Sequence, residues 1–325
     1  MQIPLHTYKY PSKPYKNRST ITQAGDMTQN NGVLLKVFCR FFLFLLQVKH
    51  SLPKNHPLMK RLFCILLTAI FVQFLSANQP YHFSHLSVKD GLSQLNVTCI
   101  YQDKSGYIWF GTRNGLNKFN GNSFEVYWNH ADNPHSISSN IINCMAEDSE
   151  GNLWVGTENG LNRLDKNKNE FKRYYINQQE NKDKDKNKIT SLCLDQQGTL
   201  WIGAASEGLF AYIPQTDSLK NISAKELKGN WVNDIIERDN KLYIASYSKG
   251  LLIYDLHQQQ VVRSFQRNSE SLPLPSNRVR KVHVDRKGNI WLGNDTHGVY
   301  VIKRDPTEVV CYNTQNGLSN NNVRC

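Results

Sequence analysis

Aromatic rings recur at a fixed spacing along this chain, and a flat apolar ring can serve as a platform for a sugar. Four of them are tryptophans, and Tyr243 takes the equivalent place in a more divergent copy; the tryptophans are Trp109, Trp154, Trp201 and Trp291. The five positions are separated by 45, 47, 42 and 48 residues. A single binding site has no need of the same ring in every copy. We therefore interpret the rings as apolar wedges packed between repeated units.

Carboxylates at a fixed distance before the aromatic ring offer a second chemistry, the binding of calcium. Each tryptophan follows an Asp-x-x-Gly turn, which begins at Asp103, Asp148, Asp195 or Asp285. Calcium takes about six to eight oxygen ligands, so one carboxylate per turn is a poor ligand set. Aspartate at the first position of a turn accepts hydrogen bonds from the following backbone amides, and glycine tolerates a positive φ. We interpret these acids as turn-capping groups.

Histidines and cysteines indicate neither a catalytic site nor a metal site. A lyase needs a general base, but the histidines of the repeat region fall at unrelated phases: His82, His85, His130, His135, His257, His283 and His297. The sequence has no Cys-x-x-Cys pair and no histidine pair at metal-ligand spacing, which argues against zinc. Cys99, Cys144 and Cys193 lie on one face of equivalent strands, as small apolar residues would. We expect no catalytic residue, metal or cofactor.

Each repeat encodes four short strands. An alternating stretch such as residues 279–284 precedes the turn, the tryptophan strand follows it, and a Gly-Leu strand such as 160–164 and a strand such as 170–174 complete the unit. Four strands in about 45 residues are typical of one blade of a β-propeller. The sequence therefore predicts an all-β propeller of about five four-stranded blades. Residues 317–325 repeat the phrase of residues 91–97, so they predict the start of a sixth blade and a truncated C-terminus.

The amino-terminal region has the pattern of a targeting segment. Met59 is followed by two basic residues, an apolar core over residues 62–75 and small residues at 76–77. This pattern predicts a signal peptide over residues 59–77, with a core that is short for a membrane span. Residues 1–58 are interpreted as an over-extended gene start, disordered or hydrophobic. Their apolar patch at 33–48 leaves open the alternative that two hydrophobic segments anchor the chain in a membrane.

The positive charge of the chain does not predict a nucleic-acid-binding surface. The net charge is +12, but residues 1–58 hold eight Lys/Arg and one acidic residue. The predicted propeller, residues 78–325, holds 29 basic and 26 acidic residues and is close to balanced. Its charge run at 180–188 alternates in sign and is interpreted as a solvated loop. We expect no direct contact between this chain and nucleic acid.

Two phrases of the repeats resemble those of a known family. They are Gly-Tyr-Ile-Trp-Phe-Gly-Thr-Arg-Asn-Gly-Leu-Asn at 106–117 and Gly-Asn-Leu-Trp-Val-Gly-Thr-Glu-Asn-Gly-Leu-Asn at 151–162, preceded by the segment 83–93. Together they closely resemble the two-component regulator propeller repeats in the periplasmic sensor region of Bacteroides-type hybrid histidine kinases. The resemblance runs from about residue 81 to residue 325. It implies a seven-bladed ring, of which this chain carries a part.

The resemblance also implies a function. Such propellers lie in the periplasm, belong to a parent protein anchored in the inner membrane, and respond to glycan fragments. A phosphorelay then controls genes for polysaccharide use. The sequence contains no kinase, receiver or DNA-binding motif, so we expect this chain to be a sensor and not an enzyme. An oligosaccharide ligand and a homodimer are the expected partners, with membrane contact only through the signal segment or a downstream helix.

The position of the ligand site and two other functions stay open at this level. Inter-blade loops at 129–133, at 267–270 and near Asp183 are candidates for ligand contact, but none is assigned as a site. The alternatives are a propeller lyase that acts on a polysaccharide or an antibiotic, and a stand-alone protein-interaction scaffold. Five blades cut from a larger ring would expose an unpaired blade face, so we expect the isolated chain to be aggregation-prone or only partly folded.

Overall fold

The computed structural model describes residues 84–177, 184–270, 272–305 and 309–324 of the chain. The predicted gene start and signal peptide therefore lie outside the described residues. Within them, none of the helices has the length and apolar character that a membrane crossing requires. The two helices that are described are short 3-10 turns, η1 (Val88–Asp90) and η2 (Lys184–Asn187). The second of these falls inside the charge run that the sequence predicts to be a loop.

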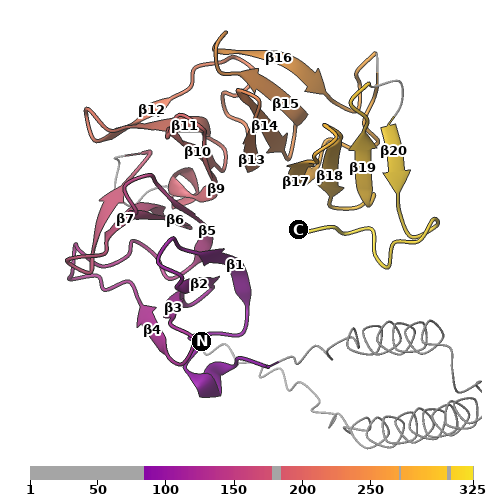
Figure 1. The fold of residues 1–325 in the computed structure, drawn as a ribbon. Coiled ribbons are helices and arrows are strands. Elements are labelled where there is room, and N and C mark those ends of the chain that lie inside the picture. The colour runs from indigo at the N-terminus through magenta and orange to yellow at the C-terminus, as the bar shows by residue number, and fades with distance from the viewer. Residues whose placement is uncertain (1–83, 178–183, 271, 306–308, 325) are drawn as a thin grey trace, which may run out of the picture. The chain divides into compact units, whose positions relative to one another are not determined.

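The described residues form five four-stranded antiparallel sheets, which confirms the all-β propeller prediction (Figure 1). We call the sheets blades 1 to 5. Blades 1 and 2 contain β1 (Val97–Gln102), β2 (Ile108–Thr112), β3 (Gly115–Phe119), β4 (Phe124–Tyr127), β5 (Ile142–Glu147), β6 (Leu153–Thr157), β7 (Gly160–Asp165) and β8 (Glu170–Tyr174). Blade 3 contains β9 (Ile189–Leu194), β10 (Leu200–Ala204), β11 (Gly208–Ile213) and β12 (Ser218–Asn221). Blades 4 and 5 contain β13 (Val232–Arg238), β14 (Lys241–Ser246), β15 (Gly250–Asp255), β16 (Gln260–Phe265), β17 (Val279–Val284), β18 (Ile290–Asn294), β19 (Val299–Ile302) and β20 (Val309–Tyr312).

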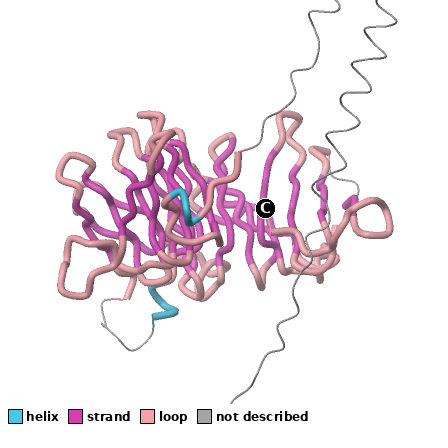
Figure 2. The backbone as a smooth tube through the Cα atoms, turned by 90° about the horizontal axis from the view of Figure 1, so that it is seen from below, coloured by secondary structure: helices cyan, strands magenta, loops and turns pink. Residues whose placement is uncertain are grey.

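In every blade the strands pair in chain order, and the first strand is the innermost one. The first strands β1, β5, β9, β13 and β17 contact one another in succession, and Figure 1 shows them along the inner side of an arc of blades. Figure 2 shows the connecting loops gathered at the two ends of the strands. The first strands therefore line the axis of the repeat array.

The Asp-x-x-Gly turn and the tryptophan form one hydrogen-bonded unit. In blade 2, Asp148 Oδ1 accepts from the backbone amides of Glu150 and Asn152 at 3.0 and 2.9 Å. Its second oxygen, Oδ2, accepts from Trp154 Nε1 at 2.8 Å. The same tryptophan-to-aspartate bond recurs at 2.8 to 3.0 Å between Trp109 and Asp103, Trp201 and Asp195, and Trp291 and Asp285. Turn capping is confirmed, and the carboxylate also satisfies the one polar atom of the buried indole.

The tryptophans pack between blades, as the sequence predicts. Trp154 of blade 2 is fully buried and packs with Ile189 and Ile202 of blade 3. Trp109 and Trp201 are buried in the same way against the blade that follows each of them. Each ring therefore joins its own blade to the next one along the chain.

A glycine two residues after the tryptophan makes room for the next blade. A Cβ atom at Gly156 would lie 2.6 Å from Ile189 Cγ2 and 2.5 Å from Cys144 Sγ. Because Ile189 is the first residue of β9, the inner strand of blade 3 inserts its first side chain into the space that this glycine leaves. In the same way, a Cβ atom at Gly293 of blade 5 would lie 3.1 Å from Val323 Cγ1. The segment that ends at Arg324 thus takes the position of the first strand of a sixth blade.

The two end blades each lack one neighbour among the described residues. Trp291 of blade 5 is 37% exposed and stacks on Tyr312, with ring centroids 6.3 Å apart. On the opposite face of blade 1, Ile100 is 64% exposed, whereas the equivalent residues of blades 2, 4 and 5 are buried, namely Met145, Ile235 and Val282. Blade 5 therefore exposes the face that carries the tryptophan, and blade 1 exposes the opposite face, on which the tryptophan of a preceding blade would pack.

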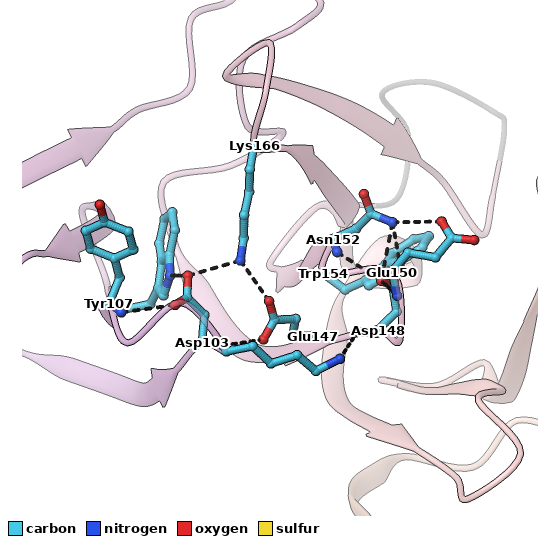
Figure 3. A network of polar contacts seen from close by, with 10 residues as sticks. Asp103, Tyr107, Glu147, Asp148, Glu150, Asn152, Trp154 and Lys166 are labelled. Atoms are coloured by element: carbon cyan, nitrogen blue, oxygen red, sulfur yellow. Dashed lines mark hydrogen bonds and ion pairs between the residues drawn. The ribbon is translucent and has the colours of Figure 1, made fainter.

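Blades 1 and 2 are also joined by buried charges (Figure 3). Lys166 Nζ lies 3.0 Å from Asp103 Oδ2 and 2.8 Å from Glu147 Oε1, and both carboxylate side chains are fully buried. The backbone amide of Lys104 donates to Glu147 Oε2 at 2.7 Å. The ammonium group thus holds together two acids that belong to neighbouring blades.

The cysteines on the first strands are free thiols. Cys99 and Cys144 face Gly111 and Gly156 across the β1–β2 and β5–β6 pairs, in agreement with the predicted common face. Their side chains are partly buried. Desolvation by burial raises the pKa of the Cys99 and Cys193 thiols to about 11. The thiols are therefore protonated near neutral pH and unreactive.

Candidate functional site

A ring of polar side chains follows the inner strands around the axis. It is formed by the second residue of each first strand and consists of Thr98, Asn143, Thr190, Asn233 and Arg280; the residue before it is buried in blades 2 to 5 and exposed in blade 1. Thr98 Oγ1 donates to the carbonyl of Ile142 at 2.6 Å, and Asn143 Nδ2 donates to the carbonyl of Ile189 at 2.9 Å. Thr190 and Asn233 make the same bond to the first residues of β13 and β17. The ring fixes the inner strands relative to one another and places polar groups at the axis.

This ring is part of a small cavity that we call the axial pocket. Its volume is about 250 Å³, and its lining adds Lys188, Trp231, Lys281 and Arg324 to the five ring residues. Residues of all five blades therefore meet in one space, although they are more than 200 positions apart in the chain at the extremes. The pocket presents hydroxyl groups, amides, cations and one indole.

Most cations of the axial pocket are held by a neighbouring acid. Lys188 Nζ lies 2.8 Å from Glu158 Oε1, Lys281 Nζ lies 3.2 Å from Asp234 Oδ1, and Arg280 pairs with Asp295. Desolvation raises the pKa of Asp234, and the ammonium group of Lys281 opposes that rise. Arg324 has no ion pair within the part of the chain that the structure describes. The ion pairs therefore fix the positions of three of the four cationic side chains that line the pocket.

An exposed aromatic pair borders the axial pocket. Trp231 immediately precedes β13, Tyr247 immediately follows β14, and the antiparallel pairing of these strands places both at the same end of blade 4. Trp231 is 42% exposed, and its ring centroid lies 6.1 Å from that of Tyr247. Lys188 Nζ lies 5.7 Å from the Trp231 ring, and Arg278 Cζ lies 5.2 Å from the Tyr247 ring. Unlike Trp109, Trp154 and Trp201, which are buried, this indole is partly exposed to solvent.

Sequence reasoning missed the axial pocket, although two signals for it exist. Trp231 is out of phase with the repeated rings, so the wedge interpretation does not account for it. A polar residue stands at the second position of every inner strand, directly after a β-branched apolar residue. The sequence assigned no ligand-binding residue, and the pocket shows which positions were overlooked.

The loops that the sequence offered as ligand contacts lie elsewhere. The loop at 129–133 is held by internal bonds such as Asn129 Nδ2 to the carbonyl of Ile137 at 2.7 Å, and Arg173 donates to the carbonyl of Asn133 at 2.8 Å. The amide of Arg267 donates to Asn277 Oδ1 at 2.7 Å. Neither loop lines the axial pocket. The third candidate, near Asp183, falls outside the described residues.

A second groove, of about 900 Å³, lies beside blades 2 and 3 and contains a carboxylate that is held by three donors. Asp217 Oδ1 accepts from Tyr174 at 2.6 Å and from Tyr212 at 2.7 Å, and Lys172 pairs with Oδ2. Desolvation acts to raise the pKa of Asp217, but the bonds from Lys172 and the two tyrosines outweigh it and lower the pKa to about 2. This carboxylate stays ionised in the folded protein at pH values where an ordinary aspartate takes up a proton.

We expect the contribution of Asp217 to stability to disappear in acid. Its pKa is lower in the folded chain than the ordinary value of 3.8, so the contribution is complete above pH 3.8 and is lost as the pH falls through about 2. Asp217→Asn should lower the free energy of unfolding by about 1–2 kcal/mol at pH 6, with allowance for solvent screening, and by much less at pH 2. Urea unfolding at both pH values measures this, with Asp132→Asn on a nearby exposed loop as control. A loss that does not depend on pH would contradict the prediction.

The potential metal ligands of the described residues are dispersed. Among the described residues, there is no group of three or more His, Cys, Asp or Glu side chains that could hold a metal ion. The acids next to the axial pocket, Glu158, Asp234 and Asp295, are each paired with a cation. The groups that the pocket does present are suited to hydrogen bonding and stacking, which are the interactions of a binding site.

Comparisons with known proteins match both the repeats and the fold. Residues 91–114, 136–159, 184–206 and 273–296 match the family described as two component regulator propeller. The histidine kinase P4 of Formosa agariphila is 42% identical over 74 residues, which are 23% of this chain and 5% of that protein. The matched segments of the family omit the divergent copy around Tyr243, as its altered turn would lead one to expect.

One solved structure with a TM-score above 0.5 shares the fold. The extracellular domain of a hybrid two-component system from B. thetaiotaomicron has a TM-score of 0.52 and 23% identity, over 76% of this chain and 39% of that one. A second such domain from the same organism has a TM-score of 0.44 and 18% identity, over 68% of this chain and 38% of that one. The chain therefore spans about two fifths of the solved domains that it resembles.

Proposed function

We propose that this chain, which carries two-component regulator propeller repeats, is the exported sensor propeller of a hybrid two-component regulator and binds a glycan fragment in its axial pocket. The observation that carries the proposal is the position of Trp231. It is the exposed indole beside a ring of amides and hydroxyl groups, in a protein whose repeated tryptophans are otherwise buried wedges or lie on an end face. An indole face with nearby amides can stack on a sugar ring and bind its hydroxyl groups.

The chemistry of the pocket favours binding over catalysis. Asn143 and Asn233 offer carbonyl oxygens as acceptors, because their amide nitrogens already donate to the next strand. Lys188 and Arg280 offer donors that can reach hydroxyl or carboxylate oxygens of a sugar. A neutral or weakly acidic oligosaccharide matches this set of partners.

The position of the pocket suggests how a ligand acts on the propeller. Its lining residues come from every blade, so one ligand contacts several inner strands at once. A ligand shifts a conformational equilibrium only to the extent that it binds one state more tightly than the other. A site shared by all blades gives that difference, because its geometry changes whenever the blades move relative to one another. The kinase and gene-regulating steps would then follow in the remainder of the parent protein.

The test is glycan binding by the purified chain and two tryptophan variants. We expect Trp231→Ala to weaken the binding of an oligosaccharide found on a glycan array by at least about tenfold, or about 1.4 kcal/mol. Trp128→Ala should bind like the unchanged protein, because Trp128 is equally exposed but does not line the axial pocket. Titration calorimetry measures both. Equal affinity of the two variants, or no bound glycan on the array, would refute the proposal.

A further inference from the structure

The junction between blades 4 and 5 departs from the pattern of the other junctions. In blade 4, Tyr243 takes the place of the tryptophan, and the turn before it contains only Asp239 and Asn240. Both turn residues have positive φ, 53° and 57°, as a two-residue hairpin turn of type I′ requires. The smaller ring and the shorter turn leave space that Trp109, Trp154 and Trp201 fill elsewhere. A groove of about 550 Å³ opens at this place.

The groove is lined by a high density of positive charge. Seven of its sixteen lining residues are basic and one is acidic; the basic ones are Arg238, Lys241, Arg263, Arg286, Lys287, Lys303 and Arg304. Three of these belong to blade 4 and four follow the inner strand of blade 5. Of these seven basic residues, only Arg238 forms an ion pair with another described residue, the exposed Asp239, at 3.9 Å. The cations of this groove therefore lack the acidic partners that the cations of the axial pocket have.

Composition does not explain this concentration of charge. Residues 78–325 hold 29 basic and 26 acidic residues, yet the groove contains seven of the former and one of the latter. Like charges that share a confined space repel one another and weaken the folded state. Apolar walls increase the effect, and the groove has such walls in Ile253, Phe265, Ile290 and Ile302. A bound anion would remove this repulsion.

We propose that this groove is a second binding site, for a small anion that carries several sulfate, phosphate or carboxylate groups. Guanidinium groups bind such oxygens through paired hydrogen bonds, and Arg263 is oriented by Phe265, whose ring centroid lies 4.6 Å from its Cζ atom. The volume lies within the range of small-ligand sites, about 300–1,000 Å³. Several charges are needed because the cations lie on both walls. No residue is shared with the axial pocket, so this site is independent of the proposed glycan site.

The proposal also predicts what the anion does to the protein. Arg238 Nη1 already donates across the junction to the carbonyl of Val284 at 3.4 Å. An anion that bridges Arg263 of blade 4 and Arg286 or Arg304 of blade 5 adds further bonds between the same two blades. It binds the assembled junction and not the unfolded chain, so it should raise the melting temperature.

The test uses three probes on the purified full chain: inositol hexakisphosphate, a heparin-derived tetrasaccharide and trigalacturonate. The first carries phosphate, the third carries carboxylate alone, and the second carries both sulfate and carboxylate, so that comparison of the second with the third isolates recognition of sulfate. Titration calorimetry at about 0.05 and 0.3 M salt should show binding of at least one probe that weakens with salt. The triple variant Arg263→Glu, Arg286→Glu, Arg304→Glu should bind that probe at least about thirtyfold more weakly, and the probe should no longer raise its melting temperature.

A control of equal net charge separates the groove from general attraction of anions. Lys225→Glu, Lys228→Glu and Lys249→Glu change the same number of exposed cations outside the groove. This control should bind the probe within about threefold of the unchanged chain. The proposal is overturned if no probe binds with a Kd below about 1 mM, if the groove variant binds normally, or if the control loses as much affinity as the groove variant. Melting curves without ligand show that both variants fold.

Discussion

Trp154→Ala should lower the free energy of unfolding by about 3–5 kcal/mol, the range for removing a large buried aromatic side chain. The indole is fully buried between blades 2 and 3, with ring centroids 4.6 Å from Tyr212 and 5.4 Å from Tyr174. Its removal leaves a cavity at the junction and takes away one of the two side-chain donors to Asp148 Oδ2, the other being Asn152 Nδ2. Urea unfolding followed by circular dichroism measures the loss.

The matched control for this prediction is Trp231→Ala. That indole is 42% exposed and belongs to no junction, so its removal should change stability by less than about 1 kcal/mol. Trp154→Phe separates the two contributions, because phenylalanine keeps most of the apolar contact but cannot donate to Asp148. If Trp154→Ala and Trp231→Ala lower the free energy of unfolding by the same amount, the repeated rings do not act as wedges between blades.

Lys166→Met should lower the free energy of unfolding by about 3–5 kcal/mol, because it leaves two buried carboxylates without their shared cation. Asp103 and Glu147 come from neighbouring blades and both side chains are fully buried (Figure 3). Methionine matches the length of the lysine stem, so the loss reflects charge more than packing. Lys188→Met is the control: its partner Glu158 is partly exposed, and we expect a loss of no more than about 1 kcal/mol.

The pH dependence of this cluster in the unchanged protein follows from the directions of its pKa shifts. Desolvation acts against the charged form of both Asp103 and Lys166. Hydrogen bonds from Trp109 and Lys166 nevertheless lower the pKa of Asp103, and the two carboxylates raise that of Lys166. The Asp103 contribution is present above the ordinary value of 3.8 and is lost as the pH falls below it. The Lys166 contribution is present below 10.5 and is lost as the pH rises through the folded-state pKa.

These directions make the prediction for Lys166→Met testable by titration. The difference in stability between Lys166→Met and the unchanged protein should be steady between about pH 5 and pH 9. It should narrow in acid, where protonation of Asp103 removes its charge from both proteins. A difference that grows as the pH is lowered would show that the buried acids are not the cause of the loss.

The sequence was sufficient to predict the repeated strands, turns and aromatic wedges, but not the side-chain contacts that join them. The spacing of Trp109, Trp154 and Trp201 predicts the blades, the turns and the wedges, because a contact that recurs in every unit leaves its pattern in every copy. The hydrogen bond from each indole to the turn aspartate was not predicted. Its two partners were interpreted separately, although their spacing of six residues is constant.

The two proposed sites could not be located from the sequence for different physical reasons. The ring of polar side chains in the axial pocket exists because the first strand of each blade is the innermost one. The pattern of strands in the sequence does not show which strand of a blade is innermost. The cations of the basic groove are scattered from Arg238 to Arg304, and only the packing of two blades brings them together. The predicted signal peptide, oligosaccharide ligand and homodimer stay predictions, as do the lyase and scaffold alternatives.

The packing of Val323 into the space beside Gly293 has a consequence for how propeller repeats evolve. Each junction is made by one side chain at the start of an inner strand and a small residue in the unit before it, which is glycine in every copy except blade 4, where it is Ala245. Duplication of a single gene segment therefore supplies both halves of a new joint at once, and no existing residue has to change. A propeller of this kind can gain or lose whole blades during evolution. A blade whose repeat has diverged, such as the one with Tyr243, can acquire a binding site that the other blades do not have.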